Sequence, residues 1–266
     1  MPWYQTKTIS VHGVQTTYYL VESQGQIQKT CIFLHGRMSA WLHFQSIAQQ
    51  LSQQWYRIIM IDLPWFAQSQ EPQTPRTISD YAQRINDILT ALQDDWISVL
   101  IWHSFGARVI IEYLTNQWNP HHLQQAILIW SWWLNTASNQ WLSTLIQSFN
   151  KLLESMGSIW SYIKQLSHRL AKKYLYSSDY KQVSPMMQQI FNQTVRYDQW
   201  SLLPQITIPV LLIRWEQDDQ TPISDAHYFA QQLPNNTLVT IPHAGHFAYL
   251  DDPVTVLASI SHFLWQ

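Results

Sequence analysis

The stretch from Trp96 to Asn116 constrains the fold more than any other part of this sequence. An apolar run, Ile97 to Ile101, stops at the small polar pair His103–Ser104, and residues with helical periodicity follow from Arg108 onward. A short apolar run predicts a buried strand, and a period of 3.6 predicts a helix. The sequence therefore predicts a serine in a tight turn between a buried strand and a helix.

A serine in such a turn can act as a nucleophile. The turn projects the hydroxyl above the edge of the sheet, beside the unpaired N–H groups that begin the helix. The motif for this turn is G-x-S-x-G, and the window here is Trp102-His103-Ser104-Phe105-Gly106, which departs from the motif at its first position. The alternative is that Ser104 is only the N-cap of the helix. Residues further along the chain favour the nucleophile.

Strands and helices alternate along most of the chain. Residues 5–22 alternate around His12-Gly13, which predicts an antiparallel hairpin. Further strands are predicted at 30–34, 57–61, 97–101, 126–129, 209–213 and 238–241, and helices at 41–53, 79–92, 224–233 and 254–264. Alternation of this kind is typical of a parallel sheet with helices on both faces.

The alternation stops between Trp132 and Leu203, where the sequence has helical periodicity and no convincing strand. We therefore expect one α/β domain formed by residues 1–131 and 204–266, with a helical insertion at 132–203. The insertion carries seven Lys and Arg against three Asp and Glu, an excess of four positive charges. Solvated helix faces explain that excess most simply, and attraction of an anionic substrate is the alternative.

Composition narrows the function classes. A formal net charge of −2 argues against an electrostatic nucleic-acid binder. The single cysteine, Cys31, cannot form an internal disulfide, which favours a reducing compartment such as the cytoplasm. The sequence shows no signal peptide and no apolar run of about 18 residues, so we expect no membrane association. It also has no metal-ligand spacing or nucleotide-binding motif, so we expect a small-molecule partner and no cofactor. The oligomeric state is left open.

Partners that could activate Ser104 follow later predicted strands. A serine hydroxyl needs a base within hydrogen-bond reach, and that base needs an acid that holds its tautomer. Asp218 and Asp219 follow one predicted strand, and His243 and His246 follow the last one. Parallel strands end at the same edge of a sheet, where open α/β sheets build their sites. The sequence therefore predicts a serine, a carboxylate and a histidine at one edge.

Together these segments resemble the α/β hydrolase superfamily, in its lid-bearing branch of small esterases and C–C bond hydrolases. The matching segments are His35-Gly36-Arg37, similar to its H-G-x loop; residues 62–69, similar to D-L-P-G-x-G-x-S; residues 215–218, similar to G-x-x-D; and residues 244–247, similar to A-G-H-F. The resemblance implies a mostly parallel, eight-stranded sheet with helices on both faces, and makes residues 132–203 a lid.

The resemblance also implies roles for individual residues. Ser104 would be the nucleophile, Asp218 the acid and His246 the base, and the backbone N–H groups of Arg37 and Phe105 would form the oxyanion hole. Asp219 and His243 remain alternatives for the acid and the base. The other candidates are expected to be structural or on the surface, namely His103, His121, His122 and His227, with Asp62 as a turn-former.

The expected chemistry is acyl transfer to water by a serine hydrolase, first of all a carboxylesterase. A C–C bond hydrolase, a thioesterase or a lactonase would use the same residues. In the family that the chain resembles, the strand–turn–helix that carries the nucleophile is called the nucleophile elbow. Haloalkane dehalogenases and epoxide hydrolases carry an aspartate at the elbow, so Ser104 argues against their chemistry. The rival from another class is a non-catalytic binding protein with the same fold, which Trp102 favours. The sequence does not name the substrate.

Tryptophan stands where the family pattern has glycine at positions 65, 102 and 215, and also at position 55. We expect these to be turn positions that need a positive φ or a close backbone approach. Either the protein carries indoles at its tightest turns, or its gene reads UGA as glycine. The 15 tryptophans and 6 glycines together make about 8% of the chain, close to the roughly 7% that glycine alone averages. Composition therefore favours the second explanation.

Overall fold

The chain divides into two compact units, Met1–Trp133 with Gln199–Gln266, and Leu134–Asp198. The computed structural model describes residues 3–27, 29–36, 41–63, 66, 68–69, 74–92, 97–116, 123–129, 184–216, 223–242 and 248–266. In the second unit it describes one helix, α6 (Pro185–Arg196), whose N-cap Ser184 accepts a hydrogen bond from the Met187 N–H at 3.3 Å. Most of the expected lid lies outside the described residues, so its role stays a prediction.

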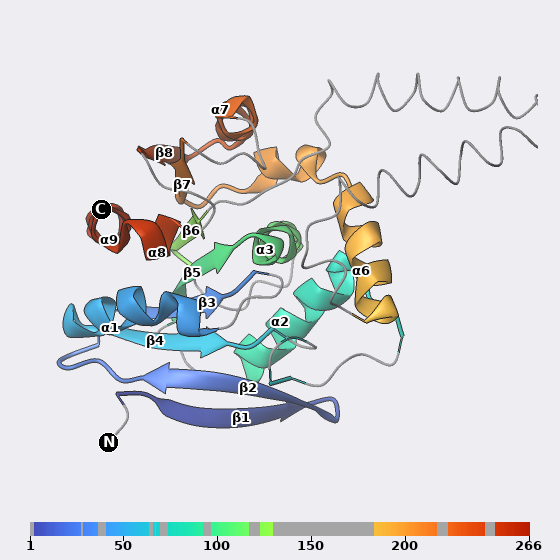
Figure 1. The fold of residues 1–266 in the computed structure, drawn as a ribbon, viewed down its shortest axis with the longest axis horizontal. Coiled ribbons are helices and arrows are strands. Elements are labelled where there is room, and N and C mark those ends of the chain that lie inside the picture. The colour runs from blue at the N-terminus through green and yellow to red at the C-terminus, as the bar shows by residue number, and fades with distance from the viewer. Residues whose placement is uncertain are drawn as a thin grey trace, which may run out of the picture. The chain divides into compact units, whose positions relative to one another are not determined.

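An eight-stranded sheet forms the first unit, in the order β1-β2-β4-β3-β5-β6-β7-β8 (Figure 1). The strands are β1 (Gln5–Val11), β2 (Val14–Val21), β3 (Lys29–Leu34), β4 (Tyr56–Ile61), β5 (Ile97–His103), β6 (Gln125–Ile129), β7 (Val210–Trp215) and β8 (Asn236–Ile241). Strand β2 pairs antiparallel with β1 and β4, and every other neighbouring pair is parallel. The prediction of a mostly parallel, eight-stranded sheet is confirmed.

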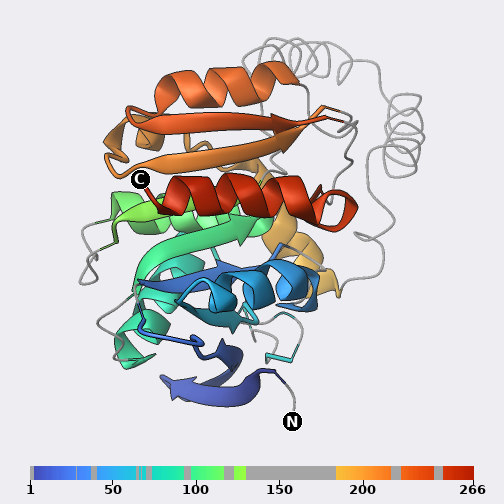
Figure 2. The same cartoon turned by 90° about the vertical axis from the view of Figure 1, so that its left-hand side faces the viewer.

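Helices cover both faces of this sheet (Figure 2). Helices α1 and α9 lie on one face, and α2 and α3 lie on the other. The helical segments of this unit are η1 (Trp41–Phe44), α1 (Gln45–Gln53), α2 (Ile78–Leu92), α3 (Phe105–Thr115), η4 (Trp200–Gln205), α7 (Ile223–Gln232), α8 (Ala248–Asp251) and α9 (Pro253–Leu264). Because both faces are covered, the central strands β5 and β6 are buried along their whole length and read as continuous apolar runs.

The predicted hairpin is confirmed at residues 5–21. Strands β1 and β2 pair antiparallel in register, with Val11 opposite Val14. His12 and Gly13 between them have φ angles of 48° and 74°. A two-residue turn with positive φ at both positions matches the twist of the flanking strands, which is why His-Gly serves here.

Two strands extend further at their C-terminal ends than the sequence predicts. Strand β5 continues through Trp102 to His103, and β7 continues to Trp215. Trp102 is paired on both sides, with Leu34 of β3 and with Leu128 of β6. The parallel ladder therefore extends the strand past the end of the apolar run. The expectation that Trp102 and Trp215 lie in turns is wrong.

Buried polar residues hold α3 against its neighbours. Arg108 and Glu112 lie on α3 and are both buried. The Gln199 side-chain amide donates to the Arg108 carbonyl oxygen at 2.9 Å and to Glu112 Oε2 at 3.4 Å, and Ser79 Oγ donates to Glu112 Oε1. Buried polar groups need such partners. These bonds tie α2, α3 and η4 together and so fix the helix that follows Ser104.

Candidate active site

Ser104 occupies a strained turn between β5 and α3. Its φ and ψ angles are 53° and −117°, and it is half-buried. The Ala107 N–H donates to the Ser104 carbonyl oxygen at 2.9 Å and closes the turn. A positive φ at a residue with a Cβ costs on the order of 1–3 kcal/mol and persists only where the surroundings impose it. The predicted tight strand–serine–helix turn is present.

Gly106 lets α3 start close to β3. A Cβ at this position would lie 3.3 Å from the carbonyl oxygens of both Leu34 and His35 and 3.4 Å from the Trp102 Cβ. Contacts of that length leave little room for a side chain. Glycine is therefore needed two residues after the serine because the helix and strand approach closely here.

Gly36 brings the loop after β3 against the same turn. A Cβ at Gly36 would lie 2.9 Å from the Ser104 Cβ and 2.8 Å from His103 Nδ1, which is closer than real Cβ atoms come. The main chain of Gly36 is thus in direct reach of the serine. Any larger residue would push the loop away from Ser104.

Phe105 follows the serine and begins α3. As the first residue of the helix, it has an N–H with no partner inside its own helix. Its ring packs against Phe66 and Tyr81, with ring centroids 5.4 Å and 5.1 Å apart. These contacts fix the Phe105 side chain at the start of the helix, and its N–H stays a predicted oxyanion donor. The second expected donor, the N–H of Arg37, lies outside the described residues.

The strands that precede the predicted acid and base end next to each other. Strands β7 and β8 are parallel neighbours, with Trp215 opposite Ile241, and the Glu216 N–H donates to the Ile241 carbonyl oxygen at 3.1 Å. They run parallel to β5, so all three end at the same edge of the sheet. The candidates themselves lie outside the described residues, namely Asp218, Asp219, His243 and His246.

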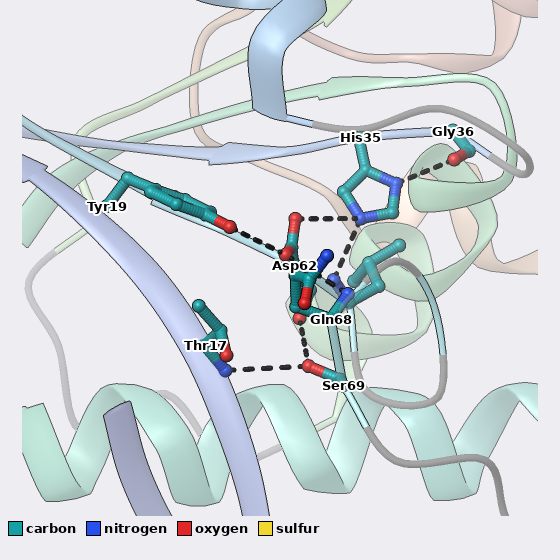
Figure 3. A network of polar contacts seen from close by, with 8 residues as sticks. Thr17, Tyr19, His35, Gly36, Asp62, Gln68 and Ser69 are labelled. Carbon is teal, nitrogen blue, oxygen red and sulfur yellow. Dashed lines mark hydrogen bonds and ion pairs between the residues drawn. The ribbon is translucent and has the colours of Figure 1, made fainter. Parts of the chain in front are cut away.

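His35 makes a buried contact that sequence reasoning missed (Figure 3). The residue is 1% exposed; Nδ1 lies 2.7 Å from the Gly36 carbonyl oxygen, and Nε2 accepts the Leu63 N–H at 2.9 Å. Burial lowers the pKa of His35 to about 4. The two contacts fit a neutral ring with its proton on Nδ1, because the Gly36 oxygen can only accept and the Leu63 N–H can only donate. The only signal in the sequence was the H-G-x pattern itself.

Asp62 anchors the loop after β4 in the same network (Figure 3). It is fully buried, and its Oδ2 accepts from the Tyr19 hydroxyl at 3.2 Å and from the Gln68 N–H at 3.4 Å. Its main-chain oxygen accepts from Ser69 Oγ at 3.2 Å. Its Oδ1 lies 3.9 Å from His35 Nε2. These contacts agree with the prediction that Asp62 shapes a turn.

The tryptophans at expected glycine positions differ from one another. Trp55 has a φ of 71° and an indole that is 48% exposed and lies against Gly25. Trp102 and Trp215 are strand residues, 2% and 0% exposed, and neither has a positive φ. Among the residues that the structure describes, no acceptor faces the buried Trp102 Nε1. Trp65 lies outside them.

The remaining histidines take varied positions. His103 is buried and stacks on Trp215, with ring centroids 6.4 Å apart, while His227 is exposed on α7. His121 and His122 lie outside the described residues. Within the described part of the chain, no three His, Cys, Asp or Glu side chains gather as a metal site would require. No helix there is both long and apolar enough to cross a bilayer.

Comparison with known proteins gives a consistent result. The sequence model of the alpha/beta hydrolase family matches residues 31–260. The uncharacterized hydrolase YugF of Bacillus subtilis is 25% identical over 97% of both chains. The 2-(acetamidomethylene)succinate hydrolase of Mesorhizobium japonicum is 22% identical, covering 88% of this chain and 87% of its own. The solved esterase of Exiguobacterium antarcticum superposes with a TM-score of 0.71 at 19% identity, covering 98% of this chain and all of its own.

Proposed function

The chain belongs to the α/β hydrolase family, and from that premise we propose that it is a serine hydrolase of small-molecule esters. The family and its curated relatives support a hydrolase. The strained turn at Ser104 carries the step from hydrolase to serine hydrolase. A φ of 53° at a serine, with Gly36 and Gly106 in close approach, is the arrangement that exposes a nucleophile to a substrate.

In the proposed mechanism Ser104 Oγ attacks the substrate carbonyl carbon while His246 accepts its proton. Asp218 holds the His246 tautomer and stabilises the imidazolium. The N–H groups of Phe105 and Arg37 bind the oxyanion of the tetrahedral intermediate. His246 then gives the proton to the leaving alkoxide, which departs as the alcohol. Water, activated by the same base, hydrolyses the acyl-enzyme and regenerates Ser104.

Other acyl substrates are compatible with the same residues. A thioester, a lactone or a vinylogous diketone would present a carbonyl carbon to the same nucleophile. The name of the Mesorhizobium relative adds a substituted succinate to the candidates. The excess of four positive charges in the proposed lid, residues 132–203, is compatible with an anionic substrate of that kind. We nevertheless place a carboxylic ester first.

A non-catalytic binding protein is the second candidate. The observation in its favour is Trp102, whose indole is buried at the motif position that usually holds glycine. A displacement of the nucleophile by about 1 Å lowers the rate about 100-fold. If the Trp102 indole displaces Ser104, the protein would bind an acyl ligand without hydrolysing it.

A fluorophosphonate probe separates the two candidates. Covalent labelling at Ser104, mapped by peptide mass spectrometry and absent in Ser104→Ala, is the expected result. p-Nitrophenyl esters of graded chain length, and a series of esters whose acyl group carries a carboxylate, then define the substrate class. A protein that binds acyl ligands but neither labels nor hydrolyses them would contradict the proposed function.

We also propose a cytoplasmic location. The single cysteine, Cys31, is fully buried and has no second cysteine with which to form an internal disulfide, which fits a reducing compartment.

A further inference from the structure

The sheet ends in two edge strands, β1 and β8, and their sequences protect them to different degrees (Figure 1). An edge strand presents main-chain N–H and C=O groups that can pair with another strand, and natural proteins usually block it with a charged residue, a proline or a bulge. Strand β1 carries the exposed Lys7. Strand β8 has no charged residue and no proline, and it pairs with β7 in one unbroken register. The edge formed by β8 therefore suits the addition of a strand.

The main-chain groups of β8 point alternately toward β7 and away from it. The Val210 N–H donates to the Asn235 carbonyl oxygen at 3.0 Å, and the Glu216 N–H donates to the Ile241 carbonyl oxygen at 3.1 Å. Because successive residues of a strand face opposite neighbours, the odd-numbered residues of β8 face β7 and the even-numbered ones face outward. Within the described part of the chain, no strand lies on that outer side. The outward-facing main chain belongs to Asn236, Leu238 and Thr240.

This outward pattern is complementary to itself. A two-fold axis pairs identical edge strands antiparallel, and an axis at Leu238 sets each Leu238 opposite its own copy and Asn236 opposite Thr240. Every outward-facing residue then exchanges N–H···O=C bonds with an outward-facing residue of the other copy, as antiparallel pairing requires. An axis at Val239 would instead set Asn236 opposite Pro242, which has no N–H to donate. The geometry therefore selects Leu238 as the centre.

The side chains around this edge favour a second copy of the chain over a charged partner. Near a two-fold axis each side chain meets its own copy, so a charged residue there would face a like charge. The sequence has no Asp, Glu, Lys or Arg between residues 226 and 250. Thr237, which is exposed, would lie opposite the half-buried Val239 of the other copy. Both are β-branched, and such side chains pack well on a pleated surface.

The edge is also held in place before any partner arrives. The Asn236 side-chain amide donates to the carbonyl oxygens of Ala230 and Leu233 at 2.8 Å and 2.9 Å. These bonds tie the start of β8 to the C-terminal end of α7. A strand that is already ordered loses less conformational entropy when it pairs.

We propose that β8 is the dimerisation edge of this protein. Two copies pair their β8 strands antiparallel about Leu238 and join their sheets into one continuous sheet. This proposal is independent of the proposed function, because it uses no residue of the candidate active site.

The oligomeric state of the wild-type chain is the first test. Sedimentation equilibrium over a range of protein concentrations should show a reversible dimer with twice the mass of the chain. A protein that stays monomeric at high micromolar concentration would overturn the proposal. A trimer would overturn it as well, because pairing about a two-fold axis stops at two copies.

Three cysteine variants test the register, namely Thr237→Cys, Leu238→Cys and Val239→Cys. Cα atoms of a hydrogen-bonded antiparallel pair are about 5.5 Å apart, which is within the range of a disulfide. Only position 238 faces its own copy, so mild oxidation should link Leu238→Cys into a covalent dimer and leave the other two variants unlinked. The wild type, whose Cys31 is fully buried, gives the background. Linkage through Val239→Cys, or through none of the three in a dimeric protein, would overturn the proposal.

Opposite charges at the axis test direct contact. Leu238→Lys and Leu238→Asp should each sediment as a monomer with the circular dichroism spectrum of the wild type, because each places like charges opposite one another. An equimolar mixture of the two should form a dimer, which also shows that both variants are folded. Thr8→Lys, at an exposed position on β1, is the control and should remain dimeric. A dimer that persists in either Leu238 variant alone would overturn the proposal. If neither variant folds, the wild-type mass and the cysteine linkage still decide.

Discussion

Ser104 and Trp55 both adopt a positive φ, and their surroundings are opposite. Ser104, at 53°, is half-buried and is enclosed by Gly36, Gly106 and the first turn of α3. Trp55, at 71°, follows the end of α1, and almost half of its side chain is exposed. Strain at the first site is imposed from several sides, whereas at the second the indole lies against Gly25 and is largely open to solvent.

We interpret the strain at Ser104 as part of the proposed site and the strain at Trp55 as having no function. Trp55 lies one residue beyond the C-cap Gln54, whose N–H donates to the Leu51 carbonyl oxygen at 2.9 Å. Helices commonly end in a glycine with positive φ at this position. In the proposed mechanism the positive φ at Ser104 directs its hydroxyl toward the substrate. No such role is proposed for the positive φ at Trp55. The two sites should therefore respond in opposite ways when the strained residue is replaced.

The largest effect is expected from Ser104→Ala. Removing the nucleophile should lower ester hydrolysis by at least about 10⁴-fold while the melting temperature stays close to that of the wild type. Initial rates with p-nitrophenyl esters and a circular dichroism melt measure both. Ser10→Ala, an exposed serine on β1, is the control and should change neither. Wild-type turnover in Ser104→Ala would refute the mechanism.

Two Asp-to-Asn variants test which carboxylate acts together with Ser104. Asp218→Asn should lower kcat by about 10⁴-fold, because an amide cannot hold the imidazole in its working tautomer. Asp219→Asn should change kcat little. Steady-state kinetics of the two variants decide between the neighbouring carboxylates. The reverse result would make Asp219 the acid.

Acid should destabilise the region around the elbow through His35. Burial lowers the pKa of His35 to about 4 from an ordinary value near 6.5, so the unfolded chain binds more protons between these values. The stability associated with the neutral ring is present above about pH 6.5 and is lost as the pH falls through about 4. The total is about 3 kcal/mol, at 1.36 kcal/mol per unit.

Urea denaturation between pH 7 and pH 4 measures this loss. The variant His35→Asn has no group that titrates at this position, so its stability should fall by less over the same range. Parallel curves for the two proteins would show that another group is responsible.

Trp102→Gly should raise hydrolysis by about 100-fold. The Trp102 Cβ lies 3.4 Å from the point where a Cβ on Gly106 would sit, so the side chain at position 102 begins next to the turn that positions the serine. A displacement of about 1 Å there costs about 100-fold in rate. Trp265→Gly, an indole 61% exposed at the end of α9, is the control and should leave the rate unchanged.

The opposite outcome is equally specific. If tryptophan belongs at 102, its removal opens a cavity in the core, and both stability and activity should fall. The codons in the gene provide a second measurement. TGA at positions 55, 65, 102 and 215 would support reading as glycine, and TGG at those positions would exclude it.

The smallest effect is expected at Trp55. Trp55→Gly should raise stability by about 1 kcal/mol because glycine adopts a positive φ without strain. That gain corresponds to about 2–4 °C in melting temperature for a chain of this size. Calorimetry would measure it, with Trp265→Gly, which has an ordinary φ of −86° at position 265, as the control. Equal shifts in both variants would show that exposure of the indole, and not φ, matters.

The sequence by itself was enough to identify the elbow, the hairpin and the alternation that gives a mostly parallel sheet. These features are written in local periodicity and in turn residues such as His12-Gly13, so neighbouring residues suffice to reveal them. Asp218 and His246 were also recognisable as candidates, because each follows an apolar run whose strand ends at the same edge of the sheet as β5. Their geometry relative to Ser104 stays a prediction.

Only the tertiary structure decided how far the strands extend and what orients the loops beside the serine. Strand β5 reaches His103 because β3 and β6 supply pairing partners that are distant in sequence. His35 bonds to Leu63, 28 positions away, and Tyr19 bonds to Asp62, 43 positions away. Hydrogen bonds between residues so far apart in the sequence leave no periodic pattern in it. They depend on which strands and loops the sheet brings together.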